Sequence, residues 1–226
     1  MFLVLNLLQT LVVLGVLPAV VIFSTAGRLD LWNVWAYIGT FVGLFVFSAL
    51  AIYRKYPDLL KERIKPAARG RGHGFLLGQL ALILFFILFF SVAGLDQRFH
   101  WSDRVPVAGV VAGLAFFAIG QGFVIWAMLV NRFFSSAVRI QSDRGQHVIS
   151  RGPYAIVRHP GYAGTALAFG ASALALNSLL LILPTALFFV VGVIRTADED
   201  RMLQKDLAGY ADYAAKVRYR LLPGVW

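Results

Sequence analysis

The residues that could carry chemistry gather in two polar segments of an otherwise apolar chain. Residues 131–162 read NRFFSSAVRIQSDRGQHVISRGPYAIVRHPGY, and residues 195–226 read RTADEDRMLQKDLAGYADYAAKVRYRLLPGVW. Gly152-Pro153 and His159-Pro160-Gly161 interrupt any helix in the first segment, because proline lacks an amide hydrogen and restricts the residue before it. We expect an ordered connector that could wrap a small polar ligand, although an ordinary basic loop at the lipid headgroups fits the composition equally well.

The second segment places Arg195 and Glu199 four residues apart, on one face of a helix. A surface ion pair, which contributes only about a few tenths of a kcal/mol, is the simplest explanation. Asp198 and Asp200 flank Glu199, however, and a bound cation would explain such an acidic cluster in a basic region. The amphipathic stripe that follows packs either at the membrane interface or over the site, and consists of Tyr210, Tyr213, Val217 and Leu221.

Apolar helices must position these two segments. The chain has 226 residues, of which 59% are hydrophobic and 14% charged, whereas an average soluble domain has about 25% charged residues. A bilayer-spanning helix needs roughly 20 apolar residues. We predict an all-α integral membrane protein with about six transmembrane helices, the last two forming a helical hairpin that turns at Asn177 and Ser178, with Pro184 as a candidate kink. The predicted spans are 7–24, 32–53, 75–94, 106–130, 162–175 and 178–194.

This pattern divides the chain into N-terminal helices, residues 1–130, and a core, residues 131–226, with the connector, the hairpin and a C-terminal helix. The predicted spans leave eighteen of the 21 Lys and Arg residues on one side. Because cytoplasmic loops carry the basic excess, both termini and both polar segments are predicted to be cytoplasmic. The net charge of +10 then reflects topology and contact with anionic lipid, and a nucleic-acid partner is not supported. The chain has no cysteine, which excludes thiolate chemistry and Cys-based metal sites.

The C-terminal half resembles the isoprenylcysteine carboxyl methyltransferases and their bacterial relatives, with phospholipid N-methyltransferases as more distant kin. The resemblance lies in GPYAIVRHPGYAG, two apolar helices, R-x-x-x-E-D-x-x-L, GYADY and RLLP. It implies a cytoplasmic site for S-adenosylmethionine (SAM) and a lipidic acceptor that enters from the bilayer. By this resemblance Arg195 positions the substrate. His159 is a second catalytic candidate, because its imidazole could act as a general base. The cofactor residues that it implies are Gln141, Gln146, His147, Val148, Ile149, Tyr154, His159, Pro160, Gly161, Tyr162 and Glu199.

Three features depart from the family pattern. The run at residue 146 begins with Gln146 where His is usual, so that His147 stands one place late. The acidic pair is Glu199-Asp200 rather than two glutamates, and the usual Phe-Gly-x-x-Tyr is Ala-Gly-Tyr.

The chemistry of these residue types agrees with a methyltransferase. A carboxylate and tyrosine faces complement the sulfonium cation of SAM. A carboxylate acceptor, with a pKa of about 4, needs no general base, whereas an amine or thiol must lose a proton. A carboxylate is therefore the favoured acceptor, a phospholipid amine or a thiol is the alternative, and His159 could serve as the base. A steroid-reductase-like membrane enzyme that uses NADPH is a further alternative, and a transporter is disfavoured because the spans lack ionisable groups.

Overall fold

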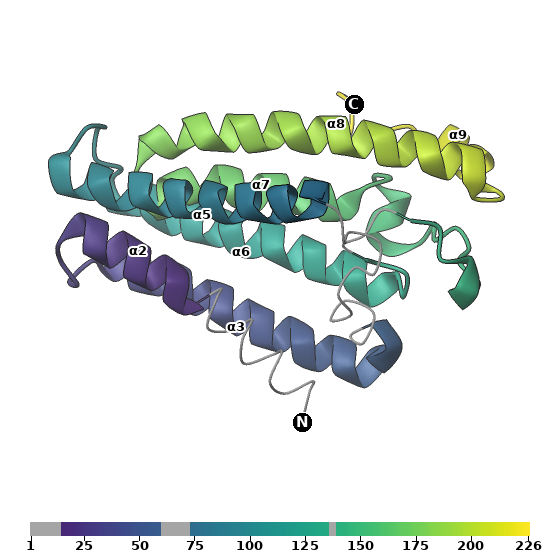
Figure 1. The fold of residues 1–226 in the computed structure, drawn as a ribbon, viewed down its shortest axis with the longest axis horizontal. Coiled ribbons are helices and arrows are strands. Elements are labelled where there is room, and N and C mark those ends of the chain that lie inside the picture. The colour runs from purple at the N-terminus through teal and green to yellow at the C-terminus, as the bar shows by residue number, and fades with distance from the viewer. Residues whose placement is uncertain (1–14, 60–72, 136–138) are drawn as a thin grey trace.

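The protein is a bundle of long helices that lie side by side, with a short helix at one end (Figure 1). The structure, a computed structural model, describes residues 15–59, 73–135 and 139–226, with the backbone alone for residues 73–79. These residues form helices and loops and contain no strand, which confirms the all-α fold. The helices are α2 (Leu17–Ala26), α3 (Trp32–Lys55), α5 (His73–Phe99), α6 (Val107–Val130), α7 (Pro160–Ala175), α8 (Ile182–Asp206) and α9 (Tyr210–Lys216), with short 3-10 turns η2 (Ser142–Arg144), η3 (Gly152–Ala155) and η4 (Leu179–Leu181).

Four helical segments of the described chain are long and apolar enough to cross a membrane: Trp32–Lys55, Leu80–Phe99, Val107–Val130 and Leu179–Asp206. Helix α7 has 16 residues, fewer than the roughly 20 that cross the hydrocarbon region. The predicted fifth span is therefore a short helix. The first predicted span, 7–24, lies partly outside the described residues, and α2 covers its second half.

The predicted hairpin turn at Asn177 is confirmed, because α7 ends at Ala175 and α8 begins at Ile182. Asn177 adopts a left-handed conformation, with φ of 51°, and its Oδ1 accepts a hydrogen bond from the Val105 amide at 2.7 Å. Pro184 lies in the first turn of α8, where its missing N–H has no intrahelical partner to lose. Helix α8 continues past the predicted end of the span at residue 194 to Asp206, so Arg195 and Glu199 lie on one helix as predicted.

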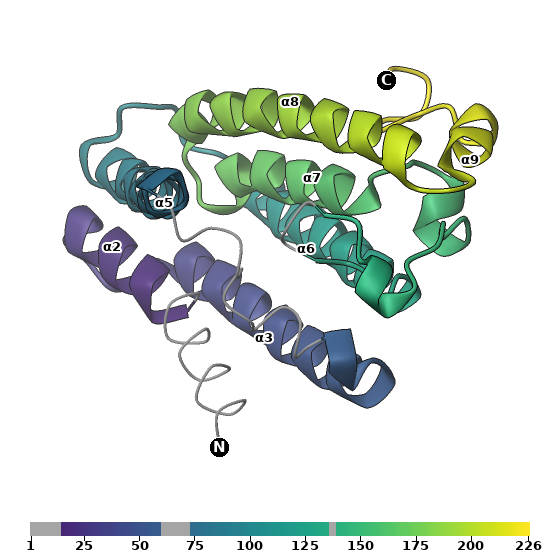
Figure 2. The ribbon, with the colours of Figure 1, turned by 45° about the vertical axis from the view of Figure 1, so that its right-hand side comes forward.

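Helix α7 lies between α6 and α8 (Figure 2), and its closest packing is against α6. Small residues make this approach possible. A Cβ built on Gly120 of α6 would lie 2.6 Å from the Gly164 carbonyl oxygen and 2.7 Å from the Ala168 amide nitrogen of α7. Backbones that approach this closely are typical of helix packing in membranes.

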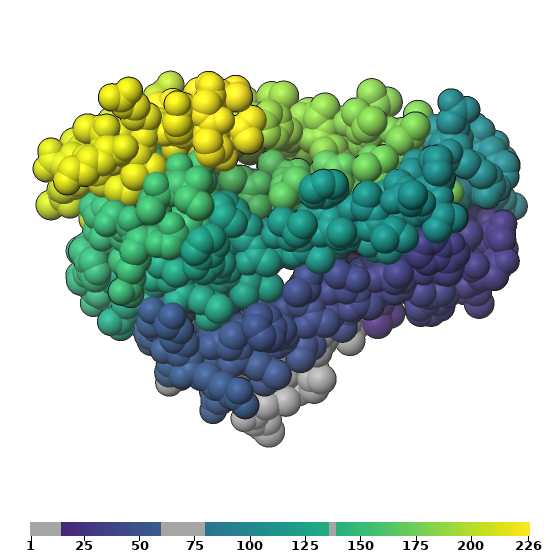
Figure 3. All heavy atoms as spheres, turned by 180° about the vertical axis from the view of Figure 1, so that it is seen from behind, coloured from purple at the N-terminus to yellow at the C-terminus, as the bar shows by residue number. Residues whose placement is uncertain are grey.

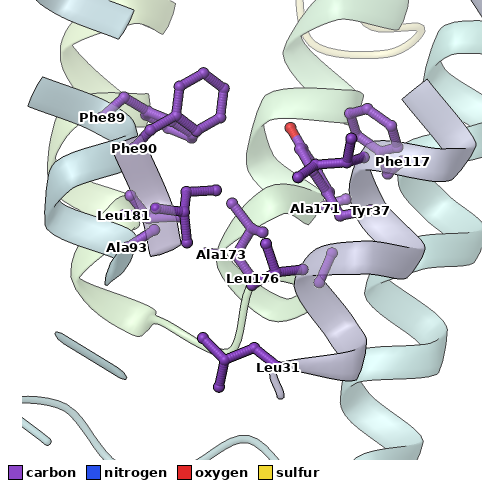
Figure 4. Packing of buried hydrophobic residues seen from close by; sticks show 14 of the residues in the cluster. Leu31, Tyr37, Phe89, Phe90, Ala93, Phe117, Ala171, Ala173, Leu176 and Leu181 are labelled. Carbon is purple, nitrogen blue, oxygen red and sulfur yellow. The ribbon is translucent and has the colours of Figure 1, made fainter. Parts of the chain in front are cut away.

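The main hydrophobic core lies away from the polar end, among α2, α3, α5, α6 and α7. Figure 4 shows Phe89 and Phe90 of α5 on one side of this core and Phe117 of α6 beside Tyr37 of α3 on the other. The core is also closed by polar contacts, since the Tyr37 hydroxyl lies 3.0 Å from Ser172 Oγ of α7.

Both polar segments lie at one end of the bundle, where α6 and α8 end and α7 begins (Figure 1). In Figure 3 the C-terminal segment, in yellow, lies directly against the connector, in green. Backbone hydrogen bonds join them, from the Arg158 amide to the Tyr219 carbonyl and from the His159 amide to the Arg220 carbonyl, each at 2.9 Å. The prediction that the two segments share a face is confirmed. The division of the chain into two parts at residue 130 stays a prediction. This boundary separates α6 from α7, the helix against which α6 packs most closely.

Candidate active site

A cavity of about 540 Å³ opens at this end, between the connector, α7, α8 and α9. Its volume lies in the range of small-molecule and cofactor sites, roughly 300–1,000 Å³. Every site residue predicted from the sequence lines it: Gln141, Gln146, His147, Val148, Ile149, Tyr154, His159, Pro160, Gly161, Tyr162, Arg195 and Glu199. Their roles stay predictions, but the residues share one space.

The connector owes its shape to turns that the sequence encodes. Gly145 and Gly152 have positive φ angles of 64° and 61°, a conformation that glycine adopts without steric cost. Pro160 is the first residue of α7, where its fixed φ suits a helix start, and His159 precedes it as the capping residue. The turns thus deliver His159 to the cavity wall at the beginning of a helix.

The two glutamine side chains hold the connector together. Gln141 is almost fully buried; its Nε2 donates to the Phe133 carbonyl at 2.7 Å, and its Oε1 accepts from Arg144. Gln146 Oε1 accepts the Gln141 amide hydrogen at 2.6 Å. The side-chain amides of Gln141 and Gln146 thus hold the connector in its shape. A ligand can contact these two residues only through the parts of their side chains that face the cavity.

Asp58, in the segment that follows α3, anchors the same connector. It accepts a hydrogen bond from Arg144 and another from Arg132 at 3.1 Å. The contact with Arg144 above all holds the pKa of the Asp58 carboxyl below its ordinary value. His147 lies further along the connector, exposed, with Nδ1 3.2 Å from the Gly145 carbonyl oxygen and its ring edge-on to Phe133.

Tyr162 joins the two charged residues of the predicted site. Its hydroxyl accepts a hydrogen bond from Arg195 Nε at 2.9 Å and donates one to Glu199 Oε2 at 3.0 Å. Arg195 and Glu199 lie one turn apart on α8, so one face of this helix presents a cation and an anion to the cavity. The tyrosine fixes their relative positions.

The acidic cluster of the sequence separates into three different environments. Asp200 is fully buried, and Asp198 is exposed and pairs with Arg201 at 3.1 Å. Glu199 alone among the three lines the described cavity. A cation bound by all three carboxylates is therefore not what the cluster represents. Among the described residues, no group of three or more His, Asp and Glu side chains could hold a metal ion.

Asp200 organises the polar wall. Its Oδ1 accepts from the Tyr210 hydroxyl at 2.9 Å and lies 3.2 Å from His159 Nε2, while its Oδ2 accepts from Arg220 Nε at 2.9 Å and from Gln204 Nε2 at 2.8 Å. The five-partner environment is completed by Arg158, whose Nη2 lies 3.3 Å from Oδ2. Because the Nε2 atom of His159 faces this carboxylate, only Nδ1 is left to act on a substrate.

Helix α9 packs over the site. The amphipathic stripe that begins at Tyr210 therefore takes the second of its two predicted positions, over the site. Tyr213 donates a hydrogen bond to the Tyr154 carbonyl at 2.7 Å, and both rings are buried. The Tyr154 hydroxyl accepts from Asn131 Nδ2 at 3.1 Å. Burial raises the pKa of Tyr154 and of Tyr213 well above the ordinary value, so both phenols stay protonated at neutral pH.

Several cavity residues were not singled out from the sequence. Asn131 is the first polar residue after the apolar run of α6, and Arg158 directly precedes His159. An apolar limb of the cavity is formed by Leu82, Phe188, Phe189, Val191 and Gly192. Spacing could have found part of this limb, because Phe188 and Gly192 lie on the α8 face that continues to Arg195 and Glu199 at helical intervals.

The fold and the cavity together describe an all-α protein with membrane-spanning helices and a ligand-sized site at one end of the bundle. Residues 108–208 match the phospholipid methyltransferase family, which is related to the isoprenylcysteine methyltransferases. The matched region contains α6, the connector, α7 and α8, and thus most of the cavity wall. The match supports a membrane methyltransferase. Among curated proteins, no significant match to the chain is found.

Proposed function

We propose that this protein is a SAM-dependent methyltransferase of the membrane, which methylates an acceptor that carries an apolar chain. The observation that carries the proposal is the composition of one cavity. Its polar end contains Glu199, Tyr154 and Tyr162, and its apolar limb lies between α5 and α8, at the depth of the membrane helices. The family match over residues 108–208 supports the same class of reaction.

The residues present fit the proposed cofactor. A sulfonium is a permanent cation, and Glu199 is the carboxylate that lines the cavity with one oxygen held by Tyr162. Buried tyrosine rings add faces that attract cations. SAM supplies an activated methyl group, so the protein has only to align an acceptor with it in a site that excludes water. Tyr154 and Tyr213 contribute to that exclusion because they close the cavity from the side of α9.

A carboxylate is the favoured acceptor group. Arg195 lies between the apolar limb and Glu199 on one face of α8, where its planar guanidinium could hold a carboxylate through two hydrogen bonds. A carboxylate is already ionised at neutral pH and needs no base. This suits a site in which His159 Nε2 faces Asp200.

A phospholipid amine is the second candidate acceptor, and the name of the matched family favours it. An amine must lose a proton before or during transfer, and His159, which lines the cavity, has its Nδ1 left to take it. A thiol acceptor has the same requirement. No contact in the cavity specifically favours the reductase alternative with NADPH.

Membranes that contain the protein, incubated with methyl-labelled SAM, test the proposal. We expect a labelled lipidic product, which mass spectrometry and alkaline hydrolysis would identify as an ester or as an N-methyl amine. Membranes with Glu199→Gln serve as the matched control and should show much less label. Equal label in the product fractions of both membranes would contradict the proposal.

A further inference from the structure

Arg158 carries a buried positive charge that the protein itself leaves incompletely bonded. Its side chain is 7% exposed and lines the cavity. Its Nε is buried and donates to no acceptor in the part of the chain that the structure describes. Its contact with Asp200 spans 3.3 Å, near the upper limit of hydrogen bonding. Buried guanidinium groups normally use several of their five donors, since an unmade hydrogen bond in the interior is costly.

The surrounding charges do not cancel. Arg158 and Arg220 both contact the single carboxylate of Asp200, so this group of three residues has a net charge of about +1 when both arginines are protonated. Arg158 is the buried cation of the two, since the Arg220 side chain is 29% exposed. Arg220 is the better satisfied of the two, because its Nε donates to Asp200 at 2.9 Å and its guanidinium lies over the Trp226 ring. The excess positive charge therefore belongs to Arg158, beside the cavity.

We propose that Arg158 binds the amino-acid carboxylate of SAM. The inference rests on the proposed function and adds a binding residue to it. An anion in the cavity would neutralise the excess charge and accept hydrogen bonds from the guanidinium. Arg158 adjoins His159 and contacts Asp200, the residue next to Glu199, and so lies on the cofactor side of the cavity. Arg195 lies beside the apolar limb and is placed for the anionic group of the acceptor instead.

A pair of ligands that differ only in the carboxylate tests the proposal. SAM and decarboxylated SAM share the sulfonium, the adenosine and the amine. In equilibrium binding to the full chain in lipid nanodiscs, we expect the wild-type protein to bind SAM about tenfold or more tightly than decarboxylated SAM, the effect of one charge-assisted interaction. Equal affinity of the wild-type protein for the two ligands would overturn the proposal without any variant.

Two matched variants assign the preference to a residue. Arg158→Gln and Arg220→Gln each remove one arginine from Asp200, but Arg220 is not among the cavity-lining residues that the structure describes. We expect Arg158→Gln to abolish the preference for SAM and Arg220→Gln to keep it. If Arg158→Gln does not fold, Arg158→Lys keeps a charge beside Asp200 and should reduce the preference.

Other outcomes are equally informative. If the Arg158 variants lower the affinity for SAM and for decarboxylated SAM by the same factor, the residue is structural and the proposal fails. If they leave cofactor binding unchanged and raise the KM of the acceptor, Arg158 holds the acceptor and the proposal fails in that direction. If the wild-type protein binds neither ligand, the proposed function itself is wrong, a result distinct from equal binding of both.

Discussion

Glu199 and Arg195 make opposite contributions to the proposed site, although the Tyr162 hydroxyl connects them. Glu199→Gln removes the charge that complements a sulfonium. We expect it to raise the dissociation constant for SAM roughly tenfold or more, which corresponds to the loss of about 1.4 kcal/mol. Arg195→Lys keeps the charge but loses the bidentate geometry. It should leave SAM affinity nearly intact and lower turnover. Calorimetry and a methyl-transfer assay measure the two effects.

The simpler explanation of this pair predicts another result. If Arg195 and Glu199 only stabilise each other at the surface, both substitutions should be mild and alike in thermal stability and in SAM affinity. Small, equal effects would restore that explanation and remove both residues from the site.

Substitutions of Tyr154 and of His159 should both affect SAM binding, but only the substitution of His159 should also lower the stability of the fold. Tyr154→Phe removes only a hydroxyl that accepts a hydrogen bond from Asn131, so we expect a folded protein with weakened SAM binding. His159→Ala should also weaken SAM binding, and it should lower the free energy of unfolding by about 1–3 kcal/mol, because Asp200 loses a buried partner. Thermal melting beside calorimetry separates the two effects. Unchanged SAM affinity in both variants would make the connector purely structural.

The sequence predicted which residues meet at the site better than it predicted what each one contacts. Glu199 and Asp200 are neighbouring acids, and adjacent helical positions point about 100° apart. The neighbouring sequence does not indicate which of the two side chains points into the protein interior. The partners of Asp200 come from Arg158, Tyr210 and Arg220, which only the folded chain brings together. The orphan donor of Arg158 was hidden from the sequence for the same reason.

At the scale of the elements, the contact between α6 and α7 sets the position of the connector between them. A Cβ on Gly120 would collide with backbone atoms of α7, whereas one on Gly122 would meet nothing within 4 Å. We therefore expect Gly120→Ala to destabilise the protein by about 1–3 kcal/mol relative to Gly122→Ala. Thermal unfolding in detergent measures the difference. Equal melting temperatures would show that the helices can move apart at no cost.

The long helices and the turn at Asn177 could be predicted because apolar runs and turn formers are local signals. The short helix α7 was also predicted, since the predicted range 162–175 compares with Pro160–Ala175, whereas the end of α8 at Asp206 was not predicted. Helix α7 is shorter than a bilayer, and buried contacts such as the hydrogen bond from Gln97 Nε2 to the Leu176 carbonyl, at 2.7 Å, satisfy its C-terminal end. Helix α8 continues to Asp206, and the residues that cover Asp200 on it, Tyr210 and Arg220, come from the C-terminal segment, which no periodicity reveals.

The distribution of basic residues predicts how the bundle is oriented in the membrane. Arg28, Arg98 and Arg104 lie at the end opposite the cavity, near the starts or ends of α2, α5 and α6. Of the basic residues that the sequence predicts on the cytoplasmic side, Lys61, Arg63, Lys65, Arg69 and Arg71 lie outside the described residues. We expect reporter fusions after Trp226 to indicate the cytoplasm and fusions after Gly94 to indicate the opposite side. A C-terminal reporter outside the cell would contradict the proposed orientation of the site.

Calorimetry of the purified protein in lipid nanodiscs tests directly whether the cavity binds SAM. Separate titrations with SAM and with NADPH distinguish a methyltransferase from a membrane reductase. We predict saturable binding of SAM, one molecule per chain, with no heat of binding for NADPH. Binding of NADPH without binding of SAM would contradict the proposed methyltransferase activity and indicate that the cavity belongs to a membrane reductase.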